Sequence, residues 1–352
     1  ENITTHQHVS LPLSSQRCDD DDKPDNYCEI DQDNTQQEKP MKGVPNMGMT
    51  CYANSIFQIL AQTQLFLSAI IPGEDMPFKP LTYSLCKVLK EINHKSENRE
   101  VVRELLEEIA NDSCFSSRRQ DDCFEFLMHI LERLKAENQQ STSMFEMTLQ
   151  TVIEHDAGSV SHVDVCDTQL SFHLLVPFYQ ETKKDNPNVE SCLNKMLNTV
   201  ENFSGKELPC RFCSGTEAPK YQVSKHFEVS TAPDILILQI GRVEHMKRRT
   251  YSDLKKRNEL VEYEHILHID EVHWDEGIRT LKRNDYQLYG VVLHAGNIEC
   301  GHYYCFVKHR NTSEWFYCND LLVRQIHARE FLNDPNAYLL FYQKFKNIVS
   351  YK

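Results

Sequence analysis

Apolar residues in the first half of the chain recur at the spacing of an amphipathic helix. After a loop that contains several glycines, four apolar residues fall on one helical face: Tyr52, Ile56, Ile59 and Leu60. The stretches Val101 to Ile109 and Cys123 to Leu134 repeat this pattern. The chain is therefore predicted to be helical and poor in strands from about Gly43 to about Lys135.

The pattern changes after Phe145 to short runs of β-branched and aromatic residues separated by polar loops. Four of these runs read as strands: Met147 to Ile153, Phe172 to Val176, Ile235 to Ile240 and Tyr286 to Val292. A helical first half followed by a β-rich second half predicts an α+β fold rather than alternating βαβ units.

Two polar stretches interrupt this picture. Residues 1–40 are rich in Asp, Gln and Asn and lack apolar periodicity, which predicts a disordered tail before a folded domain at 41–346. Between Glu244 and Asn284 the chain carries many charges, including Lys247 to Arg249 and Lys255 to Arg257. The simplest prediction for that second stretch is a solvated loop.

Composition narrows the possible classes of protein. Hydrophobic residues make up 40% and charged residues 26% of the 352 residues, as in a soluble globular protein. No apolar run approaches the roughly 20 residues that a membrane-spanning helix needs. The net charge of -14 argues against non-specific nucleic-acid binding. Residues 1–15 do not resemble a signal peptide, so we expect a location in the cytoplasm or nucleus, where most of the 13 cysteines would be reduced.

Cys51 lies between a glycine-containing loop and the first predicted helix, and so at a helix N-terminus. Backbone N–H groups and the helix dipole stabilise a thiolate there, so we expect a lowered pKa and a nucleophilic sulfur. Asn46, five residues earlier, could donate its side-chain amide to the oxyanion formed in acyl transfer. A buried structural cysteine at the start of a helix is the alternative.

A thiol protease also needs a histidine and a group that holds its imidazole ring. His302 follows Gly301 at the start of an apolar strand, and the next strand ends in Asn319 and Asp320. Asn319 could accept a hydrogen bond from the ring, and Asp320 is the alternative. His294, on the preceding strand, is predicted to be a packing residue.

Together these segments resemble the signature boxes of the ubiquitin-specific protease family of deubiquitinases. The resemblance rests on five ordered matches: Gly43 to Ser55 with Gln58, Gln120 to Leu127, Ala232 to Arg242, Tyr286 to Tyr303, and Ala337 to Tyr342. It implies a papain-like cysteine protease with a helical thumb at about 43–145, and with β fingers and palm at about 146–346.

By the same resemblance, Cys51 and His302 act as nucleophile and base, Asn46 as oxyanion donor, and Asn319 as the third triad member with Asp320 beside it. Substrate-binding roles are implied for Asp122, Glu125, His294 and Tyr303, although helix capping or solvent exposure would also explain the two acids. The expected partners are ubiquitin and ubiquitinated proteins, with no cofactor required for catalysis. Two alternatives stay open: a protease for a ubiquitin-like modifier, and an inactive ubiquitin-binding scaffold.

Many members of the family bind a structural zinc ion in the fingers through two Cys-x-x-Cys pairs. Here Cys210 and Cys213 form one such pair, while Ser159, His162 and Cys166 occupy the region of the other at poorly fitting spacing. A structural zinc that uses Cys210 and Cys213 is therefore one expectation, and fingers held by β pairing alone are the other.

Overall fold

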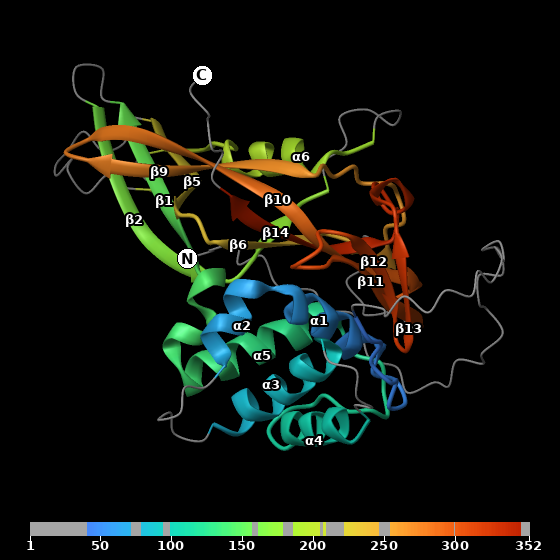
Figure 1. The fold of residues 1–352 in the computed structure, drawn as a ribbon. Coiled ribbons are helices and arrows are strands. Elements are labelled where there is room, and N and C mark those ends of the chain that lie inside the picture. Colours follow the sequence, from blue (N-terminus) through green and yellow to red (C-terminus); the bar gives the residue numbers. More distant parts are fainter. Residues whose placement is uncertain are drawn as a thin grey trace, which may run out of the picture. The chain divides into compact units, whose positions relative to one another are not determined.

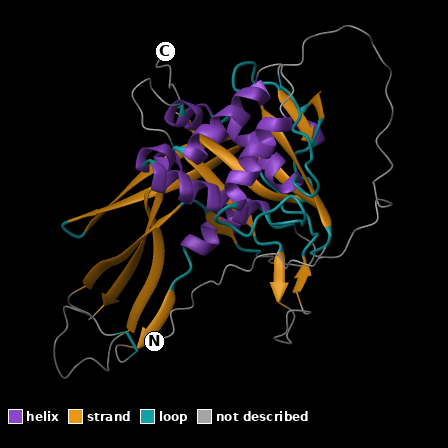
Figure 2. Cartoon of the chain, turned by 90° about the horizontal axis from the view of Figure 1, so that it is seen from below, coloured by secondary structure: helices purple, strands orange, loops and turns teal. Residues whose placement is uncertain are grey.

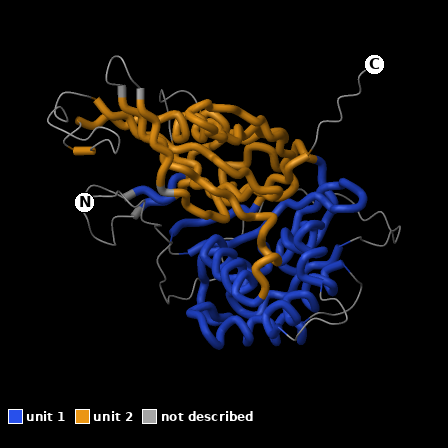
Figure 3. Tube along the Cα trace, turned by 90° about the vertical axis from the view of Figure 1, so that its left-hand side faces the viewer, with its two compact units in different colours: residues 1–137, 243–257, 292–327 blue, residues 138–242, 258–291, 328–352 orange. Residues whose placement is uncertain are grey.

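The computed structural model describes residues 41–71, 79–93, 99–156, 161–178, 186–204, 207–208, 222–245, 254–298 and 300–345. The predicted tail at 1–40 therefore lies outside the described residues. The chain forms two compact units, each built from separate stretches of sequence (Figure 3). Unit 1 comprises 1–137, 243–257 and 292–327, and unit 2 comprises the rest. This division differs from the predicted boundary near 145, because the segments around Lys256 and His302 belong with the helical first part of the chain.

The helices of unit 1 pack together as one group (Figure 1, Figure 2). They are α1 (Cys51–Gln62), α2 (Gln64–Ile70), α3 (Pro80–Asn93), α4 (Arg99–Ala110) and α5 (Cys123–Glu137). Every residue of α1 is buried, because this helix packs against α3, α5 and the strand β11 (Gly301–Lys308). The three helices predicted from periodicity are α1, α4 and α5, and none of the described helices is long and apolar enough to cross a membrane.

Unit 1 also contains strands from the second half of the sequence. β11 pairs antiparallel with β12 (Trp315–Asn319), which pairs antiparallel with β13 (Leu322–Ile326). β7 (Val243–His245) pairs antiparallel with β8 (Leu254–Lys256). α1 packs on β11, so the first helix and this strand share one core although they are far apart in the sequence.

Unit 2 is mostly β structure. One antiparallel sheet has the order β2 (Ser161–Ser171), β1 (Met147–Asp156), β5 (Gln222–Thr231) and β4 (Glu201–Ser204). A second group pairs β14 (Ala337–Phe345) with β6 (Ile235–Ile240), and β6 with β3 (Leu174–Val176). Three short helical segments complete the unit: η1 (Gln139–Phe145), α6 (Val189–Leu197) and η4 (Ala328–Glu330).

The prediction of a solvated loop between Glu244 and Asn284 is wrong for most of the described part of that stretch. β9 (Ile266–Asp275) and β10 (Ile278–Gly296) form a long antiparallel hairpin, and β10 continues from unit 2 into unit 1. Its turn consists of Glu276 and Gly277, both with positive φ, as a two-residue hairpin turn requires. Lys247 to Arg249 lie outside the described residues.

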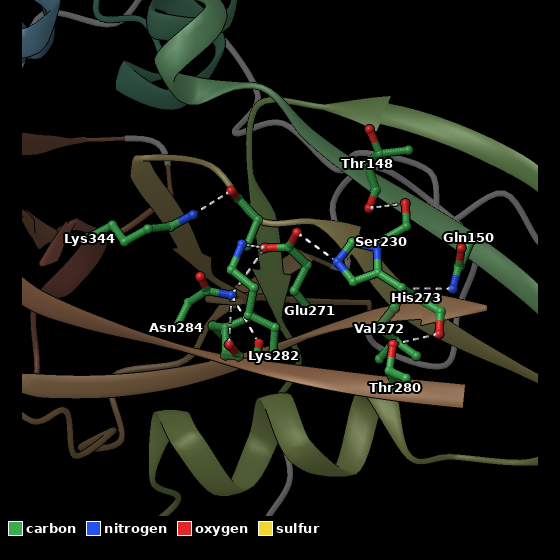
Figure 4. A network of polar contacts seen from close by, with 12 residues as sticks. Thr148, Gln150, Ser230, Glu271, Val272, His273, Thr280, Lys282, Asn284 and Lys344 are labelled. Atoms are coloured by element: carbon green, nitrogen blue, oxygen red, sulfur yellow. Dashed lines mark hydrogen bonds and ion pairs between the residues drawn. The ribbon is translucent and has the colours of Figure 1, made fainter. Parts of the chain in front are cut away.

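Buried carboxylates explain how so charged a hairpin packs. Glu271 on β9 accepts hydrogen bonds from Lys282 and Asn284 on β10, and His273 lies beside it (Figure 4). Glu228 on β5, only 4% exposed, accepts hydrogen bonds from three donors at 2.8 to 3.1 Å: Gln150, Trp274 and Arg279. Glu228 thus joins β1, β5, β9 and β10 through one carboxylate.

Replacing Glu228 with glutamine is expected to lower the free energy of unfolding by about 2 kcal/mol, since the new amide would turn N–H groups toward N–H donors. Burial alone would raise the pKa of Glu228, but its hydrogen bonds hold that pKa below the ordinary value of 4.5. Its contribution is therefore present above pH 4.5 and is lost as the pH falls through the lowered pKa. Urea unfolding at pH 7 and at pH 3.5 measures both effects. The exposed Glu201→Gln is the matched control, and equal stability of the two variants at pH 7 would contradict the prediction.

Candidate active site

Cys51 is the first residue of α1, as its place in the sequence predicts. The preceding loop folds around the side chain of Asn46, whose Oδ1 accepts hydrogen bonds from the N–H groups of Gly48 and Thr50, each at 3.1 Å. Gly48 has φ +133°, and a Cβ there would lie 2.3 Å from the carbonyl oxygen of Ser117. Only glycine fits this position, so Gly48 fixes the backbone conformation of the loop that leads to Cys51.

His302, the second residue of β11, bonds to Asn319, the last residue of β12. The ring Nε2 lies 2.6 Å from Oδ1 of Asn319, whose Nδ2 donates to the hydroxyl of Tyr317 at 2.9 Å. With its oxygen toward the ring, the amide accepts the Nε2 proton, which leaves Nδ1 of His302 as the basic nitrogen. Of the two orienting groups that the sequence left open, the contact to the imidazole belongs to Asn319.

Asp320 binds residues on both sides of Cys51, in the stretch 44–54 that we call the nucleophile segment. Its carboxylate accepts hydrogen bonds from Nδ2 of Asn46 at 2.9 Å and from Nδ2 of Asn54 at 2.7 Å, and its carbonyl oxygen accepts from the N–H of Val44 at 2.8 Å. Asp320 itself has φ +49°, a conformation that Asp and Asn tolerate better than most residues. The amide nitrogen of Asn46 has a second hydrogen, which can serve an oxyanion, and that role stays a prediction.

The thiol of Cys51 differs from the expectation of a lowered pKa. Cys51 is 5% exposed, and its pKa is raised to about 11, chiefly by burial and to a smaller extent by the negative charge of Asp320. The backbone N–H groups of Tyr303, Tyr52 and Cys51 act in the opposite direction but do not outweigh burial. The helix N-terminus is present as predicted, but desolvation by the packed strand dominates, so the sulfur is a neutral thiol at pH 7.

The four residues given substrate-binding roles lie in unit 1, and three of them are buried. Oδ1 of Asp122 accepts hydrogen bonds from the N–H groups of Phe124 and Glu125 and caps α5, while Oδ2 lies 3.4 Å from the hydroxyl of Tyr303. The ring of Tyr303 packs against that of His294, with centroids 4.5 Å apart. These contacts support helix capping for Asp122 and packing for His294, while direct substrate contact stays a prediction.

Glu125 is partly exposed, and its pKa is raised to about 7 by burial, with smaller contributions from the charges of Asp122 and Asp121. A carboxyl group with a raised pKa favours folding most below its ordinary value of 4.5, and this contribution is lost as the pH rises through 7. We therefore expect Tm to fall between pH 5 and pH 8 and the fall to be smaller in Glu125→Gln. Calorimetry across this range tests it, with the exposed Glu107→Gln as control; an unchanged slope in Glu125→Gln would refute it.

The sequence assigned no role to Asn54 or Tyr317, although each supports a predicted catalytic residue: Asn54 donates a hydrogen bond to Asp320, and Tyr317 accepts one from Asn319. Asn54 lies one helical turn after Cys51, so its amide faces the same side of α1. Tyr317 lies two residues before Asn319 on β12 and therefore shares its face of the strand. Both spacings were visible in the sequence, but the partners are distant in the chain.

Three of the residues considered for a zinc site, Cys210, Cys213 and Ser159, lie outside the described residues. The other two candidates, His162 and Cys166, lie four residues apart on β2, or about 13 Å along an extended strand. That separation is too large for both to bind one ion. Among the described residues, no group of three metal-binding side chains is close enough to hold a metal.

Comparison with known proteins identifies the family. A family model described as "Ubiquitin carboxyl-terminal hydrolase" matches residues 42–342, which is most of the chain. The chain belongs to the ubiquitin carboxyl-terminal hydrolase family. This finding confirms the resemblance, which rested on motifs spread over the same stretch.

Individual relatives in the family are distant in sequence. The probable ubiquitin carboxyl-terminal hydrolase 8 of Schizosaccharomyces pombe is 24% identical over 323 residues, covering 88% of this chain and 66% of that protein. Ubiquitin carboxyl-terminal hydrolase 8 of Saccharomyces cerevisiae is 26% identical over 343 residues, covering 86% and 70%. This chain thus spans about two thirds of the length of these relatives.

Solved structures of the family confirm the α+β fold. Ubp8, in a structure of the SAGA Ubp8/Sgf11/Sus1/Sgf73 module bound to ubiquitin aldehyde, matches with a TM-score of 0.70 at 22% identity. The match covers 87% of this chain and 70% of Ubp8. At this identity the likeness establishes the fold, while the roles of individual residues rest on the geometry of the site.

Proposed function

We propose that this chain is a cysteine-type deubiquitinase that hydrolyses isopeptide and peptide bonds at the C-terminal glycine of ubiquitin. The observation that carries the proposal is the bond between His302 and Asn319 in the same unit as Cys51, with Nδ1 left as the base. The family of the chain and the ubiquitin aldehyde bound in the Ubp8 structure support ubiquitin as the modifier. We place its action in the cytoplasm or nucleus.

The chemistry begins from a neutral thiol. Nδ1 of His302 takes the proton of Cys51 as the sulfur attacks the carbonyl carbon, and the resulting oxyanion is stabilised by Asn46 and by N–H groups near the start of α1. His302 then gives the proton to the leaving amine, which departs and leaves a thioester on Cys51. Water attacks this thioester with His302 again acting as base, which releases the carboxylate and restores the thiol.

The raised pKa of Cys51 determines the stage of the reaction at which its proton passes to His302. In an enzyme with a preformed thiolate–imidazolium pair, the proton is transferred before substrate binds. Here burial disfavours the charged sulfur, so deprotonation is expected to accompany the approach of substrate. Asn319 supports that step, because its oxygen stabilises the Nε2 proton of the imidazolium that forms.

Labelling with ubiquitin that carries a thiol-reactive group at its C-terminus tests the proposal. Wild-type protein is expected to form a covalent adduct and Cys51→Ala to form none. Cys86→Ala, which removes another buried free cysteine, is expected to react like wild type. Probes built on ubiquitin-like modifiers are run in parallel. Labelling only by one of those would replace ubiquitin as substrate, and no labelling by any probe would favour an inactive ubiquitin-binding scaffold.

A further inference from the structure

Lys256, at the end of β8, is a buried lysine. It is 7% exposed, and its ammonium group donates hydrogen bonds to the carbonyl oxygens of His294 at 2.6 Å and Gly296 at 2.9 Å. Burying an ammonium group is costly unless it is hydrogen bonded, so both carbonyls are needed to hold it there. Conversely, the lysine satisfies two backbone acceptors at the start of the loop that leads to His302.

That loop is tightly folded. Gly296 has φ +98°, and a Cβ there would lie 2.5 Å from the carbonyl oxygen of Cys300. Asn297 closes the turn, since its N–H donates to that same carbonyl at 2.8 Å and its Oδ1 accepts the N–H of Cys300 at 2.7 Å. A shift of the Gly296 carbonyl would therefore move Cys300 and Gly301, the two residues directly before His302.

Gln120, which precedes α5, holds the far end of the loop. Its Oε1 accepts the N–H of Gly301 at 3.1 Å, and its Nε2 donates to the carbonyl oxygen of the same residue. The ring of His294 covers Gly301 so closely that a Cβ would lie 2.1 Å from Nε2. The loop is thus fixed at its start by Lys256 and at its end by Gln120 and His294.

Electrostatics gives Lys256 a second effect on this loop. The pKa of His294 is lowered to about 3, chiefly by burial and to a smaller extent by the positive charges of Lys256 and His302. His294 is therefore neutral throughout the working range of pH, and its ring can pack on Gly301 and Tyr303 without bringing a second charge next to the catalytic imidazole.

We propose that Lys256 is a positioning residue for catalysis: through the carbonyls of His294 and Gly296 it fixes the loop that leads to His302 and so sets the position of the catalytic imidazole. The proposal rests on the function proposed above. Lys256 acts on the alignment of the base, and a misplacement of about 1 Å in a catalytic group can cost about a hundredfold in rate. We expect a loss in kcat with little change in KM, since alignment governs the chemical step.

Kinetics of Lys256→Met on a fluorogenic ubiquitin substrate tests the proposal, with rates normalised to the sites titrated by the ubiquitin probe. We expect kcat to fall about tenfold to a hundredfold and KM to stay within about twofold. The neighbouring Lys255→Met is the matched control, because Lys255 is exposed, and should behave like wild type. Lys256→Arg keeps the charge and the donors and should recover part of kcat. This variant also serves as the test if Lys256→Met does not fold.

The outcomes separate the two proposals. A wild-type chain that no ubiquitin probe labels refutes the proposed function. If wild type is labelled and Lys256→Met keeps its kcat per titrated site, the positioning role is refuted. A merely structural role would reduce the number of titrated sites and Tm but not the kcat of each site, and that result also overturns the proposal. If Lys256→Met does not fold, Lys256→Arg decides in its place: a kcat per titrated site below that of wild type, with KM within about twofold, supports the positioning role. A kcat equal to that of wild type overturns it.

Discussion

Asn319→Ala is expected to lower kcat/KM by about a hundredfold to a thousandfold. The change removes the acceptor 2.6 Å from Nε2 of His302, so the ring loses the contact that fixes its tautomer and orientation. Asn319→Asp is the sharp comparison, because a carboxylate oxygen keeps the hydrogen bond and stabilises the imidazolium. We expect kcat/KM of that variant to stay within about tenfold of wild type, because the negative charge favours the imidazolium that forms during the reaction.

The pH dependence of kcat/KM tests the prediction for Asn319→Asp. The carboxylate in Asn319→Asp stabilises the protonated imidazole, so the acid limb of the profile should move to higher pH, because the base must be unprotonated to accept the proton of Cys51. Tyr317→Phe, which removes the hydroxyl that accepts a hydrogen bond from Nδ2 of Asn319, should lower kcat/KM only a few-fold. If Asn319→Ala kept wild-type activity, another group would have to orient His302.

Asp320→Asn is expected to have two opposite effects on Cys51. The amide offers one oxygen where the carboxylate serves both Asn46 and Asn54, so one of these amides loses its acceptor and the oxyanion donor is displaced. We expect a fall of about a hundredfold in kcat/KM, as for the loss of an oxyanion-hole donor. The substitution also removes the negative charge that raises the pKa of Cys51, so the thiol should react faster with iodoacetamide at pH 8.

Asparagine is the right replacement because it tolerates the positive φ of this position, whereas most residues would add backbone strain. The exposed Asp270→Asn serves as a control for the loss of one negative charge. Parallel changes in turnover and alkylation, both faster or both slower, would contradict the assignment of Asp320 to the nucleophile segment.

Much of the site could be predicted because its signals are local. A glycine-containing loop before an apolar helix places Cys51 at the start of α1, and a strand that ends in Asn319 places an amide beside the preceding strand, which carries His302. The roles of Asn319 and Asp320 could not be separated this way, since they depend on the positive φ of Asp320 and on partners about 270 residues earlier in the chain.

The pKa of Cys51 could not be predicted for a related reason. Its environment depends on packing of α1 against β11, a contact between segments far apart in the sequence. The charged hairpin of β9 and β10 was missed because Glu228 and Glu271 bury their charges only through specific partners. Alternation of apolar and polar residues is weak where such pairs replace apolar packing.

The neutral state of the Cys51 thiol has a consequence for its chemistry in an oxidising environment. Peroxides attack thiolates far faster than thiols, and burial keeps this sulfur protonated while the enzyme is idle. Its proton leaves during turnover, when His302 accepts it. That proton leaves only as the sulfur bonds to the substrate carbonyl, so neither the resting enzyme nor the thioester presents a free thiolate to peroxide. We therefore expect oxidative inactivation of Cys51 to be slow, whether or not substrate is present.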